Sequence, residues 1–243
     1  MALALRRADD ALVLGHRLSE WTGHAPMLEE ELALANLALD LIGQARALYA
    51  LAAELEGGDR DEDALAYLRT EREYSNLLLL ELPKGDFAVT IVRQFLYASF
   101  ADRWWRAGIA SVEPRLAAIA AKAEKETAYH VRHSAEWLIR LGDGTTESHA
   151  RAQAALDRLW PFTGEMFEPE DADLVAAGIC IDPPSLRAAW NRDVDAVLAE
   201  ATLQRPREGW MQTGGRQGRH SEHLGHMLAE MQHLQRTYPG AKW

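Results

Sequence analysis

The sequence lacks the features that would place the protein in several common classes. Its one cysteine, Cys180, cannot form an internal disulfide, and no basic N-terminal region precedes an apolar run of the kind that directs secretion. The longest leucine-rich run, at 77–82, contains Glu81 and is far shorter than the roughly 20 residues that a membrane-spanning helix needs. We therefore expect a cytoplasmic protein without a membrane segment.

Basic residues are scarce relative to acidic ones. The 26 Lys and Arg against 37 Asp and Glu give a formal charge of −11, whereas a nucleic-acid surface depends on many bases that neutralise phosphates. No Ser-, Gly- or Pro-rich linker divides the chain, so we expect one domain over residues 1–243. No stretch alternates apolar and polar residues between turn signals, so no strand is predicted.

Apolar residues recur at helical spacing over most of the sequence. It predicts long helices at 26–55, 61–82, 86–108 and 114–141, and shorter ones at 147–160, 185–203 and 219–236. Gly57-Gly58 and Pro83-Lys84-Gly85 end the first two helices, and Gly142-Asp143-Gly144 ends the fourth. The short connections make two antiparallel hairpins. The fold class is therefore all-α, a four-helix bundle of long helices with additional C-terminal helices.

A bundle of this kind can hold two iron ions between its helices. Two helices then each give one Glu or Asp, and two give Glu-x-x-His, because positions i and i+3 share a helix face. The second and fourth sets are altered here, and the third helix offers only Asp102, about one turn from its middle. The positions nearest to the pattern are Asp40, Glu73 with Asn76 at i+3, and Glu126 with His130, where Thr127 precedes His130 by three. A structural hydrogen bond or ion pair is the commoner role for each.

Other patterns are weaker. His220, His223 and His226 follow one another at i+3 steps, but one helix cannot easily bring all three onto one ion. The turn Thr213–Gly218 leads into the last helix and, with Arg216 and Arg219, suggests either an anion site or a tight structural turn. Whether Arg216, Arg219 and Lys242 form such a site or only solvate the C-terminal end stays open. No Gly-x-Ser-x-Gly element is present and Cys180 has no evident base, so no catalytic residue is predicted. The eight tryptophans fit either a partner interface or the core.

Three long strings resemble one known family. They are LGHRLSEWTGHAPMLEEELALANLALDLIGQARAL from Leu14, RTEREYSNLLLLELPKGDFAVTIVRQF from Arg69, and TGGRQGRHSEHLGHMLAEMQHLQ from Thr213. They resemble the C subunits of bacterial phenylacetyl-CoA epoxidases, multicomponent enzymes of phenylacetate degradation, and the likeness spans nearly the whole chain.

The resemblance implies a ferritin-like fold and a related A subunit that binds the di-iron centre and the CoA thioester. It implies that the complex converts phenylacetyl-CoA to its ring 1,2-epoxide with O₂, with electrons from a separate reductase. The catalytic relative's two Glu-x-x-His pairs fall on Glu73 with Asn76 and on Thr127 with His130. Both pairs are broken in this chain.

The leading hypothesis is a non-catalytic structural and assembly subunit that pairs with the catalytic A subunit and holds no cofactor itself. The di-iron centre is then expected in the partner, and Asp40, Glu73, Asn76, Glu126 and His130 are vestigial metal positions. The alternative is a di-iron oxygenase with altered ligands at these positions. A stand-alone helical protein that binds a small molecule ranks third. Self-association of the chain alone as a homodimer stays open.

Overall fold

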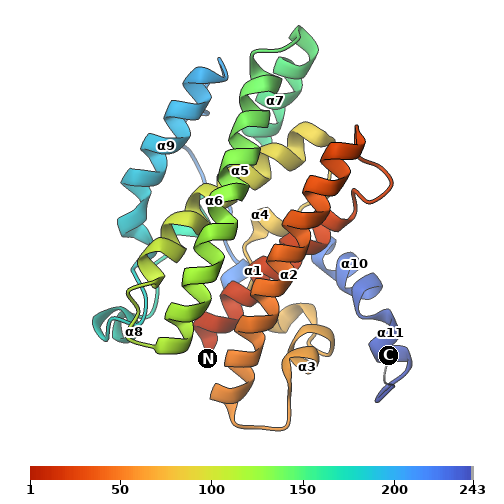
Figure 1. Cartoon of the computed structure of the whole chain (residues 1–243), viewed down its shortest axis with the longest axis vertical. Coiled ribbons are helices and arrows are strands. Elements are labelled where there is room, and N and C mark those ends of the chain that lie inside the picture. The colour runs from red at the N-terminus through yellow and green to blue at the C-terminus, as the bar shows by residue number, and fades with distance from the viewer. Residues whose placement is uncertain (242–243) are drawn as a thin grey trace. The chain divides into compact units, whose positions relative to one another are not determined.

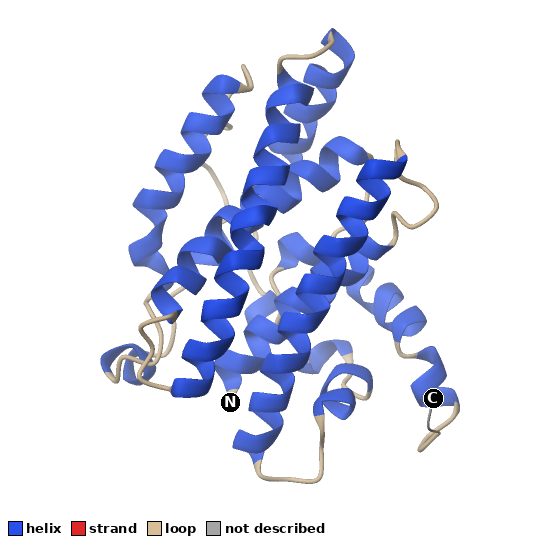
Figure 2. Cartoon of the chain, in the orientation of Figure 1, coloured by secondary structure: helices blue, strands red, loops and turns tan. Residues whose placement is uncertain are grey.

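The computed structural model describes residues 1–241, and these residues contain helices and loops without a β-strand, as Figure 2 shows. The contacts between residues divide the chain into two compact units. The first unit combines Met1–Pro83 with the C-terminal segment from Thr213, and the second is Lys84–Gln212. The expectation of one domain stays a prediction, and each unit is described by itself.

The first unit is built on two long antiparallel helices, α1 (Ala2–Ser19) and α2 (Leu28–Glu56). Gly15 of α1 lies against Ala38 and Leu41 of α2, so closely that an added Cβ would sit 3.3 Å from the Ala38 carbonyl oxygen. Shorter elements complete the unit: α3 (Glu62–Tyr67), a 3₁₀ turn η1 (Glu71–Glu73), α4 (Leu78–Glu81), a 3₁₀ turn η5 (Gly215–Gln217), α10 (Glu222–Met231) and α11 (His233–Thr237).

Two of the predictions for this unit were wrong. The long helix expected at 61–82 is instead two short helices, one 3₁₀ turn and extended backbone between them. The hairpin partner of α2 is α1, a helix that was not predicted. The other predicted elements of this unit were close, since α2 begins two residues after 26 and the last predicted helix is split into α10 and α11.

The second unit is built on α5 (Phe87–Gly108) and α6 (Pro114–Gly142), whose bounds match the prediction within a residue. Asp86 caps α5 by accepting a hydrogen bond from the Val89 amide at 3.0 Å, and Pro114 occupies the first turn of α6. The two helices run antiparallel in Figure 1. The remaining elements are α7 (Thr146–Leu159), α8 (Ala172–Ala176), α9 (Arg187–Glu200) and the 3₁₀ turns η2 (Trp160–Phe162), η3 (Gly164–Phe167) and η4 (Pro183–Leu186).

Aromatic side chains fill the core of the second unit. Trp190 of α9 is buried, donates its Nε1–H to the Leu96 carbonyl at 3.0 Å, and has its ring centroid 5.2 Å from Phe167 and 5.7 Å from Trp160. The Phe167–Trp190 contact is edge-to-face, and such contacts add to the free energy gained from burying apolar area. These aromatics are therefore core residues, which is one of the two roles that the sequence left open for them.

Candidate functional site

The first unit contains a cluster of three carboxylates, Asp9, Asp10 and Glu81, each with no exposed surface. Asp9 accepts hydrogen bonds from the Tyr49 hydroxyl at 2.6 Å, from the Ser75 amide at 2.8 Å and from the Arg69 guanidinium. A buried carboxylate is costly unless it is paired with a charge and hydrogen-bonded. We call Asp9, Asp10, Glu81 and their partners the buried carboxylate cluster.

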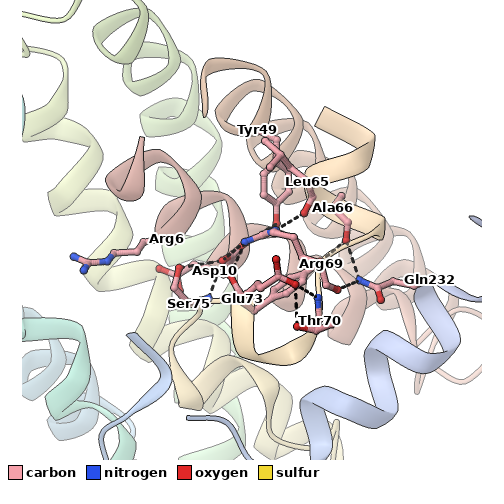
Figure 3. Close-up of polar contacts among 12 residues, drawn as sticks. Arg6, Asp10, Tyr49, Leu65, Ala66, Arg69, Thr70, Glu73, Ser75 and Gln232 are labelled. Atoms are coloured by element: carbon pink, nitrogen blue, oxygen red, sulfur yellow. Dashed lines mark hydrogen bonds and ion pairs between the residues drawn. The ribbon is translucent and has the colours of Figure 1, made fainter. Parts of the chain in front are cut away.

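Arg69 connects this cluster to the irregular segment that follows α3. Figure 3 shows it among Tyr49, Leu65, Ala66 and Glu73, with Gln232 approaching from the end of α10. Its guanidinium lies over the ring of Tyr74 at 4.3 Å and donates to the Glu73 carbonyl at 2.9 Å. Burial and the charge of Asp9 raise the pKa of Tyr49 well above its usual value, so that hydroxyl stays protonated and donates.

Asp10 holds the C-terminal segment. The guanidinium of Arg216 donates to both of its oxygens, at 3.0 and 2.8 Å, and also to the Ser75 carbonyl at 2.7 Å. The Leu77 amide donates to Asp10 at 2.9 Å. Bidentate Arg–carboxylate pairs are geometrically specific. One side chain of α1 therefore fixes two segments that are distant in sequence.

Glu81 makes the third set of contacts. Its carboxylate accepts from Asn76 Nδ2 at 2.9 Å, from the Ser221 amide at 2.6 Å and from His220 Nδ1 at 2.7 Å. His220 Nε2 lies 2.9 Å from the Tyr74 carbonyl oxygen, which can only accept. The Tyr74 contact therefore requires a proton on Nε2, and the contact with the Glu81 carboxylate favours a second proton on Nδ1, so the geometry favours the imidazolium form of His220. Burial lowers the pKa of His220, but the hydrogen bond and charge of Glu81 outweigh it and raise the pKa above 6.5.

The cluster binds backbone rather than a ligand. Its three carboxylates accept hydrogen bonds from backbone amides, those of Ser75, Leu77 and Ser221. Its basic side chains donate to backbone carbonyls, those of Ser75, Glu73 and Tyr74. Irregular backbone that is buried needs such partners, because it has no helical hydrogen bonds of its own. The arrangement therefore fastens residues 69–83 and 213–221 to α1.

The structure separates Glu73 from Asn76, the two positions of the altered second Glu-x-x-His set. Glu73 ends the η1 turn, is exposed, and accepts hydrogen bonds from the Thr70 amide at 2.8 Å and the Thr70 hydroxyl at 2.9 Å, which lower its pKa. Asn76 is fully buried in extended backbone and donates to Glu81. Because no α-helix joins them, their spacing of three does not place them on one helix face.

The candidate positions in the second unit are also engaged locally. Glu126 pairs with Lys122 one turn earlier, at 3.4 Å, and Thr127 donates its hydroxyl to the Ala123 carbonyl at 2.7 Å. His130 is buried on α6, and Asp102 of α5 pairs with Arg106 at 2.8 Å, with burial raising its pKa. In the first unit, Asp40 lies half-buried on α2.

The C-terminal candidates have structural contacts. His220 precedes α10 and bonds Glu81, while the carbonyl of His223 accepts a hydrogen bond from Arg17 at 3.3 Å. Arg216 is occupied by Asp10, which favours the tight structural turn over the anion site. At Gly218, φ is +69° and an added Cβ would lie 2.4 Å from the Arg72 carbonyl oxygen, so glycine is required there. Lys242 lies outside the described residues.

The residues present do not fit a di-iron centre of the usual kind. Within residues 1–241, no three His, Cys, Asp or Glu side chains form a group that could hold a metal ion. Asn76 and Thr127 replace a ligand in each of the two Glu-x-x-His sets, and an amide or hydroxyl is a poor substitute for imidazole or carboxylate. That this chain holds no cofactor stays a prediction.

Sequence reasoning missed the centre of the cluster. It did not single out Asp9 and Asp10, although two adjacent aspartates directly before the apolar run ALVLG of α1 are an unusual feature. It noted Glu81 only as an interruption of a leucine run. A carboxylate within an apolar helix is a signal of a buried pair. The partner of Glu81 is His220 and that of Asp10 is Arg216, and both lie too far along the chain to be paired by spacing.

Comparison with known proteins places the chain in the phenylacetic acid catabolic protein family, whose model matches residues 1–243. The chain belongs to this family, and its fold is all-α and ferritin-like, as predicted. A curated relative is the C subunit of the 1,2-phenylacetyl-CoA epoxidase of Escherichia coli (strain K12), which is 52% identical over 248 residues covering 100% of this chain and 98% of the relative. The resemblance noted in the sequence is therefore confirmed. Among the described residues, no helix has the length and apolar character to span a bilayer.

Proposed function

We propose that this chain is a non-catalytic structural subunit of a phenylacetyl-CoA epoxidase in phenylacetate catabolism. It pairs with the catalytic subunit, which carries the di-iron centre, and supports that subunit's helices. The relative that is 52% identical over the full chain is named as the C subunit of such an epoxidase. The name of this relative supports the assignment of the chain to a multi-subunit enzyme. The side chains at the altered ligand positions support a non-catalytic role for this subunit.

The main support for this proposal is the position of Glu73 and Asn76, the residues of the second Glu-x-x-His set. A working set needs its carboxylate and imidazole on one helix face, directed at a common ion. Here the Glu73 carboxylate accepts two hydrogen bonds from Thr70, and the Asn76 amide donates to Glu81. Both side chains support the local backbone, in a segment that is not a helix. These two positions therefore serve the structure of the first unit.

The experiment is an iron determination on the full-length chain, purified alone after growth with added iron, and on the chain co-expressed with the catalytic subunit. We expect well under one iron in the lone chain and about two per heterodimer in the complex, since a di-iron site holds two. Elemental analysis measures both. Close to two irons in the lone chain would overturn the proposal and favour the alternative, an oxygenase with altered ligands.

Variants sharpen this test. Asp40→Ala, Glu73→Ala and Glu126→Ala should each leave the iron content of the assembled complex unchanged, because these side chains do not bind it. Glu54→Ala, an exposed position on the same helix as Asp40, is the matched control. Loss of iron from a complex that still assembles, in a candidate variant but not in the control, contradicts the proposal.

A further inference from the structure

The first unit has a groove between α3 and α11. Its volume is about 660 Å³, within the range of roughly 300–1,000 Å³ that is usual for ligand pockets. The walls come from the first turn of α3, from the residues that end α3, and from α11 with the residues after it. Figure 1 shows the two helices beside each other near the C-terminus. We call this the α3–α11 groove, and among the residues that line it are Asp61, Asp63, Tyr67, Leu68, Gln235 and Tyr238.

Side chains of the C-terminal segment fix the two walls of the groove to each other. Gln232, which is buried, donates to the carbonyls of Ala66 at 3.2 Å and Arg69 at 2.9 Å, and Figure 3 shows it reaching them from the end of α10. Arg236 donates to the Arg69 carbonyl at 3.0 Å and to the Leu68 carbonyl at 3.5 Å. The groove is therefore formed in advance, and a partner that enters it loses little free energy in ordering it.

Large apolar side chains line the groove and are exposed. Leu68, which follows α3, has 57% of its surface exposed, and Tyr238, which follows α11, has 56%. Tyr67 also lines the groove and is half-buried. Burial and the charge of Asp63 raise the pKa of Tyr67, so its hydroxyl stays protonated. Exposed apolar side chains gathered at a groove mark a binding surface.

Two carboxylates of the groove have no basic partner. Asp61 caps the first turn of α3, and Asp63 is exposed in that turn. Within residues 1–241, no basic side chain forms an ion pair with either carboxylate, because the bases nearby are used elsewhere. Arg46 and Arg60 pair with glutamates outside the groove, and Arg236 donates to backbone carbonyls. The groove is therefore open to a cation.

A buried acceptor in the groove also lacks a donor. Oε1 of Gln235, on α11, has less than 1 Å² exposed and no hydrogen-bond partner among the described residues. Buried polar atoms are nearly always hydrogen-bonded. Together with the carboxylates of Asp61 and Asp63, this oxygen gives the groove three acceptors for the N–H donors of an incoming group, next to apolar side chains.

We propose that the α3–α11 groove docks a basic segment of the catalytic subunit. The segment places a Lys or Arg side chain between Asp61 and Asp63 and an apolar side chain against Leu68 and Tyr238. Charge complementarity favours this occupant, because the unpaired side chains of the groove are acidic or accept hydrogen bonds. The aliphatic stem of a Lys or Arg packs on apolar surface while its charged end reaches the carboxylates. The inference rests on the proposed function, which makes the catalytic subunit the partner.

Calorimetric titration of the full chain with the purified catalytic subunit tests the two carboxylates. Asp61→Asn combined with Asp63→Asn should raise the dissociation constant at least about tenfold, and asparagine at position 61 still caps α3. Asp59→Asn is the matched control, because Asp59 is exposed in the same acidic stretch but does not line the groove. It should change the dissociation constant less than about twofold, and added salt should weaken the wild type more than the double variant.

A second variant and a local label test the apolar side of the groove. Leu68→Ala should raise the dissociation constant about fivefold, because it removes apolar area that the segment covers. Leu55→Ala is its control, since Leu55 is 55% exposed on α2 and does not line the groove. Hydroxyl-radical labelling of the wild type should mark Leu68 and Tyr238 in the lone chain and mark them much less in the complex. Unchanged midpoints of urea unfolding show that the variants fold.

The outcomes separate this inference from the proposed function. Wild-type binding that the groove variants retain in full overturns the inference and leaves the proposed function standing. A wild-type chain that does not bind the catalytic subunit contradicts the proposed function, and the inference with it. If Leu68 is protected in the lone chain and gains labelling when the chain ends at Ala241, the groove belongs to the chain's own C-terminus and the inference fails.

Discussion

The two units solve the same packing problem with different chemistry. Each is built on a pair of long antiparallel helices, but the first unit stabilises irregular segments around its pair with buried charges, and the second uses regular helices with aromatic side chains. Asp9 and Trp190 illustrate the difference, since both are buried. Asp9 binds the backbone of Ser75 in the first unit through its charge, and Trp190 binds the backbone of α5 at Leu96 in the second through its aromatic side chain. Where backbone leaves the helix, polar side chains must replace its hydrogen bonds, and where it stays helical, apolar packing suffices.

The largest expected effect is in the first unit. Asp9→Asn should lower the free energy of unfolding by about 3–5 kcal/mol, because it leaves the buried guanidinium of Arg69 without its counter-charge. Asp193→Asn removes the partner of Arg103 in a solvent-exposed pair of the second unit and should cost less than about 1 kcal/mol. Urea unfolding measures both. Similar losses in the two variants would break the comparison between the units.

An intermediate effect is expected in the aromatic core of the second unit. Trp190→Leu removes the Nε1 hydrogen bond to Leu96 and part of the ring volume packed on Phe167, so it should cost about 2–3 kcal/mol. Because no titrating group is involved, this loss should be the same at pH 6 and pH 9. Thermal unfolding at the two pH values measures this loss. A loss that depends strongly on pH would show that titrating groups also stabilise the core of the second unit, contrary to the comparison.

The smallest effect expected at a buried interaction is the one at His220. Its pKa in the folded protein is raised above 6.5, so its contribution is fully present below pH 6.5 and is lost as the pH rises through the folded pKa. His220→Gln should therefore destabilise the protein by about 1 kcal/mol at pH 6 and by less at pH 9. The measurement is the difference in unfolding free energy between wild type and variant at each pH. A difference that grows with pH would contradict the protonated state inferred from the geometry.

The second unit could be predicted from sequence because its signals are local. Asp86 caps α5, Pro114 begins α6, and Gly142 is the last residue of α6. Residues at the ends of the two helices therefore indicate where they begin and end. By contrast, α1 has neither a side-chain cap nor an acidic residue in its first turn, and it was missed.

The segment 61–82 shows why the candidate site could not be predicted. Its leucines have helical spacing, but the Ser75 and Leu77 amides bond Asp9 and Asp10 of α1 instead of carbonyls of their own segment. Tertiary contacts override local preference in such cases. The replacement of histidine by Asn76 could be seen in the sequence. The structural roles of Glu73 and Asn76 could not, because they depend on the positions of their partners Thr70 and Glu81 in the fold.

The bond between Asp10 and Arg216 joins residues 206 positions apart and has a consequence for biosynthesis. During translation, α1 leaves the ribosome long before Arg216 and His220 exist, so its carboxylates face water or temporary partners while the second unit is made. The first unit can close only after residues 213–221 have been made. In a chain that ends before residue 213, Asp10 therefore lacks Arg216 and Glu81 lacks His220, so a nonsense mutation before that position should leave these buried carboxylates without their basic partners.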